Sequence, residues 1–386
     1  MRTTGDQPLE TPFETVGEPK TDRPAKPPFR HRAMLAPHDL NAALAPRDRH
    51  ETAIRDLVSL LHDAKCRLTS SASLDDAAAL DAVTATTLPR WRHLVGTAAE
   101  AARALRSDAE QFDRCRQAAR SSLLPLLIEG PIWDRSYHKP RGYPGDYGVM
   151  NFVYDRSDEG PHPFARLCHR LGLDVGACVR TRLQYVVDEL ATRMSAGGDR
   201  LRVLSLGCGS SREVAPAIAR GVPRREVELV LLDQDPEALG AARSFVDPAI
   251  ASCTSGRVGA QYTRVGFGQV LRDASLMRQW SGQDLVYCLG LLDYVPNEQL
   301  QPLATALFSL VTPGGMLILG NMKDPSSTFW PLDFILDWPL TYRTEREMLD
   351  LASCLNAHRS HLTLEETGNN FVLKLWKPPD VAGGTT

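Results

Sequence analysis

Two kinds of hydrophobic pattern divide the chain. From about residue 40 to 130, apolar residues recur at helical spacing, as at Ile54, Leu57 and Leu61. A second helical pattern covers roughly 163–194 and stops at "SAGGD", a turn signal. We therefore expect helices to dominate the chain up to about residue 195.

Beyond this point, short apolar runs alternate with helical patterns. The runs predict strands at 201–206, 227–233, 261–267, the start of 284–295, and 314–322. The stretch 361–378 predicts two more strands, joined at Gly368. Asp235 and Pro236 predict the N-cap and first turn of a helix. Such alternation is typical of an α/β fold with a parallel sheet covered by helices on both faces, and the terminal hairpin adds an antiparallel edge.

Composition narrows the class of protein. A chain of 386 residues indicates two domains or one large domain with additions, and a net charge of −3 argues against a general nucleic-acid binder. No apolar run has the length of a membrane span, and no secretory signal follows Met1. The eight cysteines form no C-x-x-C pair, so we expect reduced thiols, no metal site and a cytoplasmic protein.

The two ends of the chain differ from the rest in composition. Residues 1–36 are rich in Pro, Thr, Lys and Glu and carry hardly any apolar periodicity. Such a segment buries too little surface to offset the entropy of ordering, so we expect a disordered tail. We also expect residues 378–386 to be flexible.

The stretch "LRVLSLGCGSSREV" (201–214) holds the first candidate for ligand binding. A buried strand, a turn with Gly207 and Gly209, and a helix start would expose backbone N–H groups beside a ligand. The dinucleotide fingerprint G-x-G-x-x-G requires a third glycine, which lets the helix pack close to the strand. Arg212 occupies that position, so the pattern disfavours a dinucleotide.

Four stretches in order, "VLSLGCGSSREV", "LVLLDQDPEAL", "QDLVYCLGLLDYVP" and "LVTPGGMLILGNM", resemble the motifs of class I S-adenosylmethionine-dependent methyltransferases. The resemblance covers about 201–377. It implies a Rossmann-like seven-stranded sheet, mostly parallel with an antiparallel terminal hairpin, and S-adenosylmethionine as the cofactor. An N-terminal helical cap domain at 37–136 and a segment of linker and helices at 137–200 would precede this methyltransferase domain.

The resemblance also implies roles for single residues. Gly207 and Gly209 would let the backbone approach the cofactor, where a Cβ would intrude. Asp233, at the end of the second strand, would accept both ribose hydroxyls; the alternative role of helix N-cap belongs to Asp235. The adenine contact after the third strand stays open. The expected cofactor-binding residues are Tyr137, Arg141, Tyr143, Gly207, Cys208, Gly209, Asp233, Gln234, Leu289 and Gly290.

A second unusual stretch, "YHKPRGYPGDYGVMNFVYD", spans 137–155. Its residues 143–146 predict a type II turn with Gly145 supplying the positive φ. Either this is a rigid surface turn, or it closes over the cofactor pocket with Tyr137, Arg141, Tyr143 and Asp146 facing cofactor or substrate. The second reading follows from a resemblance to the "KPxGYxGD" signature of a bacterial methyltransferase group, shared also through "LGLLDYVP" and "YRTEREM". That group includes enzymes associated with 3-hydroxy fatty acid methyl esters.

The segment after the fifth strand is rich in aromatic residues. Its aromatic side chains either line a substrate pocket or pack as core; they are Trp330, Phe334, Trp338 and Tyr342. Arg343 could hold an anionic group through a bidentate contact. Thr344 and Glu347 predict a capping box at the start of the next helix.

The acceptor decides which catalytic groups are needed. A carboxylate is already ionised at neutral pH and needs no base, whereas an amine, phenol or carbon acceptor must lose a proton. The base candidates are His138, Asp146 and Tyr154, which join Arg343 as the catalytic candidates. We expect carboxyl O-methylation of a hydroxy fatty acid-like small molecule. The alternatives are N- or C-methylation in a specialised pathway and a non-catalytic cofactor-binding interaction protein; a homodimer is compatible with each.

Overall fold

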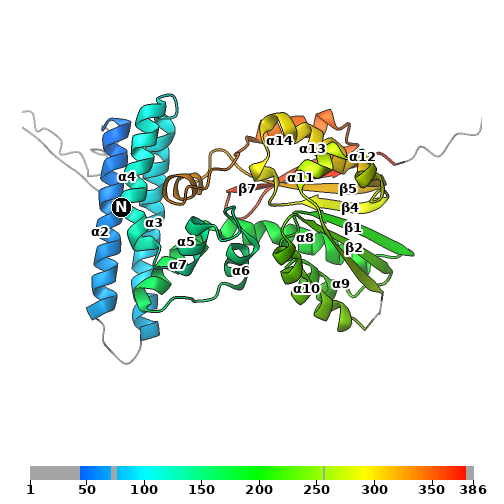
Figure 1. Cartoon of the computed structure of the whole chain (residues 1–386), viewed down its shortest axis with the longest axis horizontal. Helices are drawn as coiled ribbons and strands as arrows, with labels where there is room; N and C mark the ends of the chain where they lie inside the picture. Colours follow the sequence, from blue (N-terminus) through cyan, green and yellow to red (C-terminus); the bar gives the residue numbers. More distant parts are fainter. Residues whose placement is uncertain (1–43, 71–75, 255–256, 380–386) are drawn as a thin grey trace, which may run out of the picture. The chain divides into compact units, whose positions relative to one another are not determined.

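The computed structural model describes residues 44–70, 76–254 and 257–379. The chain divides into two compact units, 1–43 and 44–386, and only the second contains described residues. The expected tail at 1–36 and most of the C-terminal segment 378–386 lie outside the described residues. Figure 1 labels helices and strands of the second unit.

Helices fill the described chain up to residue 195, in agreement with the apolar spacing. They are α2 (Pro46–Ser70), α3 (Asp76–Ala104), α4 (Ala109–Leu127), α5 (Pro131–His138), α6 (Tyr147–Asp155), α7 (Pro163–Val175) and α8 (Ala177–Ser195). The first long pattern is interrupted between α3 and α4, where the Asp108 side chain accepts a hydrogen bond from the Gln111 N–H and caps α4. Figure 1 shows α2, α3 and α4 side by side.

A seven-stranded sheet follows, with the order β3-β2-β1-β4-β5-β7-β6. Its strands are β1 (Arg200–Leu206), β2 (Glu226–Asp233), β3 (Val258–Arg264), β4 (Gln283–Cys288), β5 (Val311–Met322), β6 (Arg359–Leu364) and β7 (Asn370–Trp376). Strand β7 is antiparallel to both neighbours, and the pairs among β1 to β5 are parallel. The predicted α/β fold with a mostly parallel sheet and an antiparallel terminal hairpin is confirmed. Strand β3 is shifted by three residues and ends at Arg264, because the chain turns at Gly266 into the next helix, and β5 begins three residues before the predicted position, at Val311.

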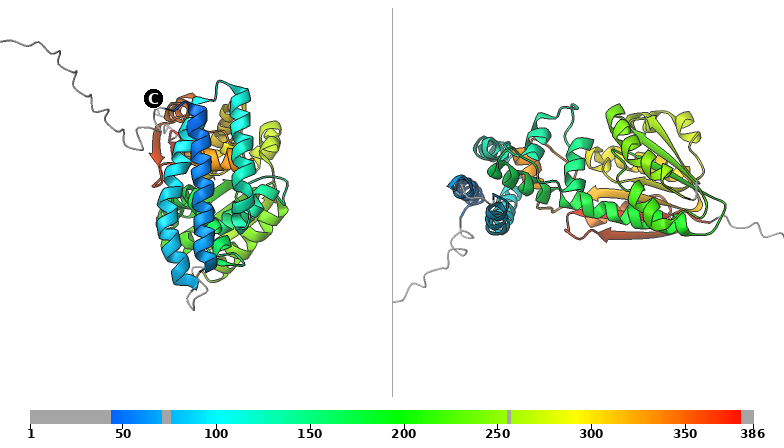
Figure 2. Two further views of the ribbon diagram at one scale, coloured as in Figure 1. Left: turned by 90° about the vertical axis from the view of Figure 1, so that its left-hand side faces the viewer. Right: turned by 90° about the horizontal axis from the view of Figure 1, so that it is seen from below.

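Helices cover both faces of this sheet (Figure 2). On one face, α8 packs with α9 (Val214–Gly221) and α10 (Pro236–Ala251) over side chains such as Val203 of β1. The other face carries α11 (Phe267–Arg272), α12 (Ala274–Arg278), α13 (Asn297–Leu310) and α14 (Glu345–Cys354). Leu204, the next residue of β1, points to that second face, as the alternation of side chains along a strand requires.

The segment after β5 reaches from the sheet into the helical part. Trp330 and Phe334, around the short π-helical segment η2 (Pro331–Ile335), are fully buried in the same core as α2 and α4. The Trp330 Nε1 donates a hydrogen bond of 2.9 Å to the His50 Nε2. Burial lowers the pKa of His50 to about 4, so the neutral ring can accept this bond. This segment therefore ties the helices to the sheet.

Within the described ranges, no helix combines the length and the apolar character that crossing a membrane requires.

Candidate active site

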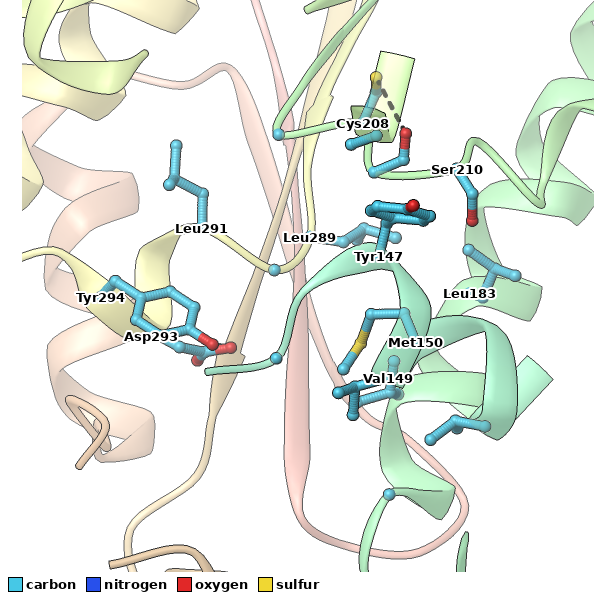
Figure 3. Close-up of a pocket in the computed structure, with 18 of the residues that line it drawn as sticks. Tyr147, Val149, Met150, Leu183, Cys208, Ser210, Leu289, Leu291, Asp293 and Tyr294 are labelled. Atoms are coloured by element: carbon cyan, nitrogen blue, oxygen red, sulfur yellow. Dashed lines mark hydrogen bonds between the residues drawn. The ribbon is translucent and has the colours of Figure 1, made fainter. Parts of the chain in front are cut away.

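A cavity of about 300 Å³ lies at the carboxyl ends of β1, β2 and β4, where open α/β sheets bind ligands. Helices α5 to α8 and the segment after β5 complete its wall. Figure 3 shows Cys208 and Ser210 at one end of the cavity and Val149 and Met150 of α6 at the other, with Tyr147 drawn between. The two ends differ in chemistry: one is polar and the other apolar.

The turn after β1 forms the polar end. Gly207 and Gly209 have φ values of 68° and 53°, a region that glycine adopts without strain. The N–H groups of Gly207 and Cys208 both donate to the Leu232 carbonyl, at 2.8 and 3.0 Å. The turn is therefore fixed to the end of β2.

Asp233 stands beside this turn at the end of β2. Its Oδ2 accepts from the Gly209 N–H at 2.8 Å and its Oδ1 from the Asp235 N–H at 2.9 Å. Each carboxylate oxygen keeps a further acceptor site for a ligand hydroxyl. Burial raises the pKa of Asp233, whose side chain lines the cavity. Asp235 caps α10 through the Glu237 N–H, as predicted.

A second carboxylate, Glu213, lines the cavity at the start of α9. Its side chain is buried, and the Tyr287 hydroxyl of β4 donates to Oε1 at 2.6 Å. In the part of the chain that the structure describes, no Lys, Arg or His forms an ion pair with Glu213. Burial raises the pKa of Glu213, because the charged form loses hydration without gaining a cation. The carboxylate is therefore suited to a cationic ligand group.

The loop 139–146, which we call the strap, crosses the cavity. At one end, the Arg141 guanidinium forms two hydrogen bonds to Asp235, at 2.7 and 2.9 Å, and the Tyr143 hydroxyl donates to the same carboxylate at 3.1 Å. At the other end, Tyr294 donates to the Pro144 carbonyl at 3.2 Å. The strap is thus held both to the sheet helix α10 and to the segment after β4.

Gly145 occupies the turn position of the strap that only glycine fits, for two reasons. Its φ is +69°, as a type II turn requires, and a Cβ there would lie 2.2 Å from Trp338 Cζ2. The Trp338 indole packs on the strap and donates from Nε1 to the Tyr294 hydroxyl at 3.0 Å. Asp146 then caps α6 through the N–H groups of Gly148 and Val149.

The other end of the cavity is an apolar chamber. It is lined by Ile132, Trp133, Val149, Met150, Val153, Gly172, Val175, Cys178, Val179, Leu183, Leu332, Leu336, Trp338 and Leu340. Most of these side chains also belong to, or pack against, the core of the helical part. The chamber therefore suits an extended apolar group.

An ion pair lies on the cavity wall beside this chamber. Arg182 of α8 donates from Nη1 to the Asp293 Oδ2 at 3.3 Å, and both side chains are buried. The Met322 N–H donates to the other oxygen of Asp293 at 2.6 Å. Burial raises the pKa of Asp293, and Arg182 opposes that rise.

The structure brings most of the expected site residues to one cavity. Those that line it are Tyr143, Tyr154, Gly207, Cys208, Gly209, Asp233, Gln234, Leu289 and Gly290. Tyr154 is the one base candidate among them, and burial raises its pKa to about 12.

Other expected residues lie outside the cavity wall: Tyr137, His138, Arg141, Asp146 and Arg343. His138 is bonded to Asp134 near the surface. Arg343 does not line the cavity: its fully buried guanidinium donates to the carbonyls of Leu292 and Val295, at 2.9 and 2.6 Å, and to Asn321. It fixes the segment after β4 instead.

Of the aromatic residues after β5, one lines the cavity and the others pack inside the protein. Trp338 lines the cavity, whereas Trp330 and Phe334 are core, and Tyr342 packs against Phe329. The capping box of Thr344 and Glu347 is present as predicted.

Three charged residues of the cavity wall, Arg182, Glu213 and Asp293, were not predicted from the sequence. Each carried a signal: Arg182 interrupts an apolar stripe of α8 between Val179 and Val186, and Asp293 interrupts the apolar run "CLGLLDYV". Glu213 has the weaker signal, a single acid in the first turn after the glycine motif.

Comparison with known proteins gives structural likenesses only. No protein-family model matches the chain, and no curated protein matches it. A possible exported protein from Bordetella parapertussis has a TM-score of 0.47 at 16% identity, covering 84% of this chain and 97% of that chain. Magnesium protoporphyrin IX methyltransferase from Synechocystis PCC 6803 has a TM-score of 0.44 at 16% identity, covering 63% and 97%. The S-adenosylmethionine-dependent methyltransferase SibL has 0.44 at 17%, covering 87% and 99%. All three TM-scores are below 0.5.

Proposed function

We propose that this chain is an S-adenosylmethionine-dependent methyltransferase that methylates a carboxylate of a small, hydroxy fatty acid-like acceptor. The observation that carries the proposal is the pairing of two unlike ends in one cavity. A glycine turn with two buried carboxylates, Asp233 and Glu213, opens into the apolar chamber.

The polar end fits the cofactor group by group. Asp233 has acceptor sites for the two ribose hydroxyls. The glycines at 207 and 209 line the cavity without a side chain that would fill it. Glu213 would hold the cofactor ammonium, which supplies the cation that the buried carboxylate otherwise lacks. Bound S-adenosylmethionine would supply an activated methyl group on a sulfonium.

Glu213 argues against a dinucleotide, whereas an acid at the position of Asp233 is compatible with both kinds of ligand. Glu213 lies at the start of α9, where a dinucleotide would place its pyrophosphate, and its carboxylate would repel that group. Arg212 does not offset this repulsion, because it is paired with Asp155 and its guanidinium lies 4.0 Å from the centre of the Phe245 ring. The third glycine of the dinucleotide fingerprint is also absent.

The ionisable groups of the cavity wall favour an acceptor that is already ionised before the reaction. Of the base candidates predicted from the sequence, His138 and Asp146 lie outside the cavity wall, and Tyr154 with its pKa of about 12 is a phenol at neutral pH. The two carboxylates of the wall other than Asp233 already accept hydrogen bonds, Glu213 from Tyr287, and Asp293 from Arg182 and the Met322 N–H. A carboxylate needs no base, so the residues have only to bind, orient and exclude water. Proximity and orientation can then supply roughly 7–11 kcal/mol of the barrier.

The test is turnover by the full chain. It is incubated with S-adenosylmethionine and a panel of 3-hydroxy fatty acids, and products are identified by mass spectrometry, with Asp233→Ala as the inactive control. We expect S-adenosylhomocysteine and a fatty acid methyl ester. Turnover only with amines or carbon acceptors from a small-molecule extract would replace the acceptor class, and no S-adenosylhomocysteine with either set would contradict the proposal.

A further inference from the structure

Arg182 is a buried cation on the cavity wall, and the proposed function assigns it no role. It lies on α8, and Cys178, Val179 and Leu183 of the same helix line the apolar chamber. Of these four residues, only Arg182 carries a charge. One face of one helix therefore presents a cation beside an apolar surface, which is the complement of an amphipathic anion such as a fatty acid.

The guanidinium is incompletely used by its protein partners. Its Nη1 donates to the Asp293 Oδ2 at 3.3 Å. The side-chain amide of Asn370 is oriented so that both its N and its O have hydrogen-bond partners, and in this orientation Nη1 also donates to the Asn370 oxygen at 2.9 Å. Among the described residues, none accepts a hydrogen bond from Nη2 or Nε. Since an arginine carries five N–H donors, several remain for a ligand in the cavity that this side chain lines.

The position of the guanidinium sets what it can reach. Its Nη2 would lie 3.0 Å from a Cβ placed on Gly290, just beyond the end of β4. Gly290 and Leu289 form part of the cavity wall shared by the polar end and the apolar chamber. A group bound to Arg182 would therefore lie where the two ends of the cavity meet.

We propose that Arg182, oriented by Asp293, binds the carboxylate of the acceptor and selects ionised acids over neutral molecules of the same chain length. This proposal rests on the proposed function and names the residue that sets its substrate class. Asp293 holds the guanidinium in place, and the second oxygen of Asp293 is occupied by the Met322 N–H.

The charge change during transfer fits this role. One carboxylate oxygen attacks the methyl carbon, an O–C bond forms, the C–S bond breaks, and its electron pair stays on sulfur. A cationic cofactor and an anionic acid thus become two molecules without those charges, the thioether and the ester. The ester has no charge to pair with Arg182, which keeps only Asp293, so the product binds more weakly than the substrate.

The experiment compares ligands that differ only in the head group. Binding of dodecanoate, 1-dodecanol and methyl dodecanoate to the full chain is measured by calorimetry in the presence of S-adenosylhomocysteine. The variant is Arg182→Gln with Asp293→Asn, which removes both charges together and leaves no unpaired buried ion. Arg180→Gln, on the same helix but outside the cavity wall, is the matched control.

We expect the wild-type chain and the control to bind dodecanoate about 10- to 100-fold more tightly than the alcohol or ester, the range for hydrogen bonds to a charged group. The double variant should lose that preference while its affinity for S-adenosylhomocysteine stays unchanged. An unchanged preference for the acid, or no binding of any of the three by the wild type, would overturn the proposal.

A second pair of ligands shows whether Arg182 binds the carboxylate of the acceptor or the carboxylate of the cofactor's amino acid group. S-Adenosylhomocysteine carries an amino acid group and 5′-methylthioadenosine does not. If the double variant weakened only the former and kept its preference for dodecanoate, Arg182 would serve the cofactor and the proposal would be wrong. If the wild type bound neither nucleoside, the proposed function would fail, while the comparison of acid and alcohol, repeated without nucleoside, would still test Arg182.

Discussion

The Tyr287 hydroxyl donates a hydrogen bond of 2.6 Å to the Glu213 carboxylate, joining β4 to the start of α9 at the wall of the cavity. Both side chains are buried, and burial raises the pKa of each. A carboxylate kept in such a place without a protein cation is costly unless a ligand supplies the charge.

Glu213→Gln should weaken the binding of S-adenosylhomocysteine about 10- to 100-fold, because a charge-assisted hydrogen bond to the ligand ammonium is lost. Tyr287→Phe should have a smaller effect, since it removes only the group that orients the carboxylate. Calorimetry measures both. The matched control is Glu298→Gln, at an exposed position in the first turn of α13. Equal affinity in Glu213→Gln and the control would remove Glu213 from the site.

The affinity for S-adenosylhomocysteine should depend on pH in a defined direction. The pKa of Glu213 in the chain lies above its usual value of 4.5, so part of the carboxyl is protonated as the pH falls toward that raised value. The ligand ammonium favours the ionised form, so affinity should rise with pH from 4.5 through the raised pKa and then level off.

Titrations between about pH 5 and 8 measure this dependence. The pKa of Asp233 is raised in the same sense, so the informative quantity is the difference between the wild type and Glu213→Gln. The variant should show the shallower dependence. Affinity that falls with rising pH in the wild type would contradict the assignment.

Asp233→Asn should abolish recognition of the ribose hydroxyls. The wild type is expected to bind S-adenosylhomocysteine about 10- to 100-fold more tightly than its 2′,3′-dideoxy analogue, and the variant should bind the two alike. The preference between the two ligands is the readout because Asp233 also accepts from the Gly209 and Asp235 N–H groups, so the variant also loses stability. A preserved preference would assign Asp233 to the fold alone.

Gly145→Ala should disturb the strap, and Gly142→Ala should not. Both glycines have positive φ, +69° and +81°, so each alanine carries a similar backbone penalty of about 1–2 kcal/mol. Only at Gly145 does the new Cβ meet a side chain, Trp338 at 2.2 Å; nothing lies within 4 Å at Gly142. We expect the acceptor KM to rise at least about tenfold for Gly145→Ala alone, since a 1.4 kcal/mol loss suffices. Equal values for the two variants would mean that the strap does not shape the acceptor site.

Arg343→Met should affect stability rather than the acceptor KM. The substitution leaves the buried carbonyls of Leu292 and Val295 without their donor, at about 1–3 kcal/mol for each. Denaturant unfolding should show a loss of at least about 2 kcal/mol. The control Arg346→Met removes an exposed side chain of the next helix and should be neutral. A stable variant with a raised KM would restore Arg343 to the acceptor site.

The fold was accessible from the sequence because its signals are local. Apolar runs, the glycine turn and the Asp235 cap each reflect an interaction within a few residues of chain, and the structure reproduces them. The capping box at Thr344 and the positive φ of Gly145 belong to the same class.

The charged part of the site depends on contacts between distant segments. Arg182 meets Asp293 across 111 positions, and Glu213 meets Tyr287 across 74, so no local pattern shows either pair. Arg343 illustrates the opposite error: its place after β5 suggested a ligand contact, but carbonyls of the segment after β4 take up its donors.

Calorimetric titration of the full chain with S-adenosylhomocysteine and, separately, with NAD⁺ shows which nucleotide the glycine turn binds. We predict saturable one-to-one binding of S-adenosylhomocysteine that Glu213→Gln weakens, and no binding of NAD⁺ at the same concentrations. Binding of NAD⁺ in preference to S-adenosylhomocysteine, or no binding of S-adenosylhomocysteine, would contradict it.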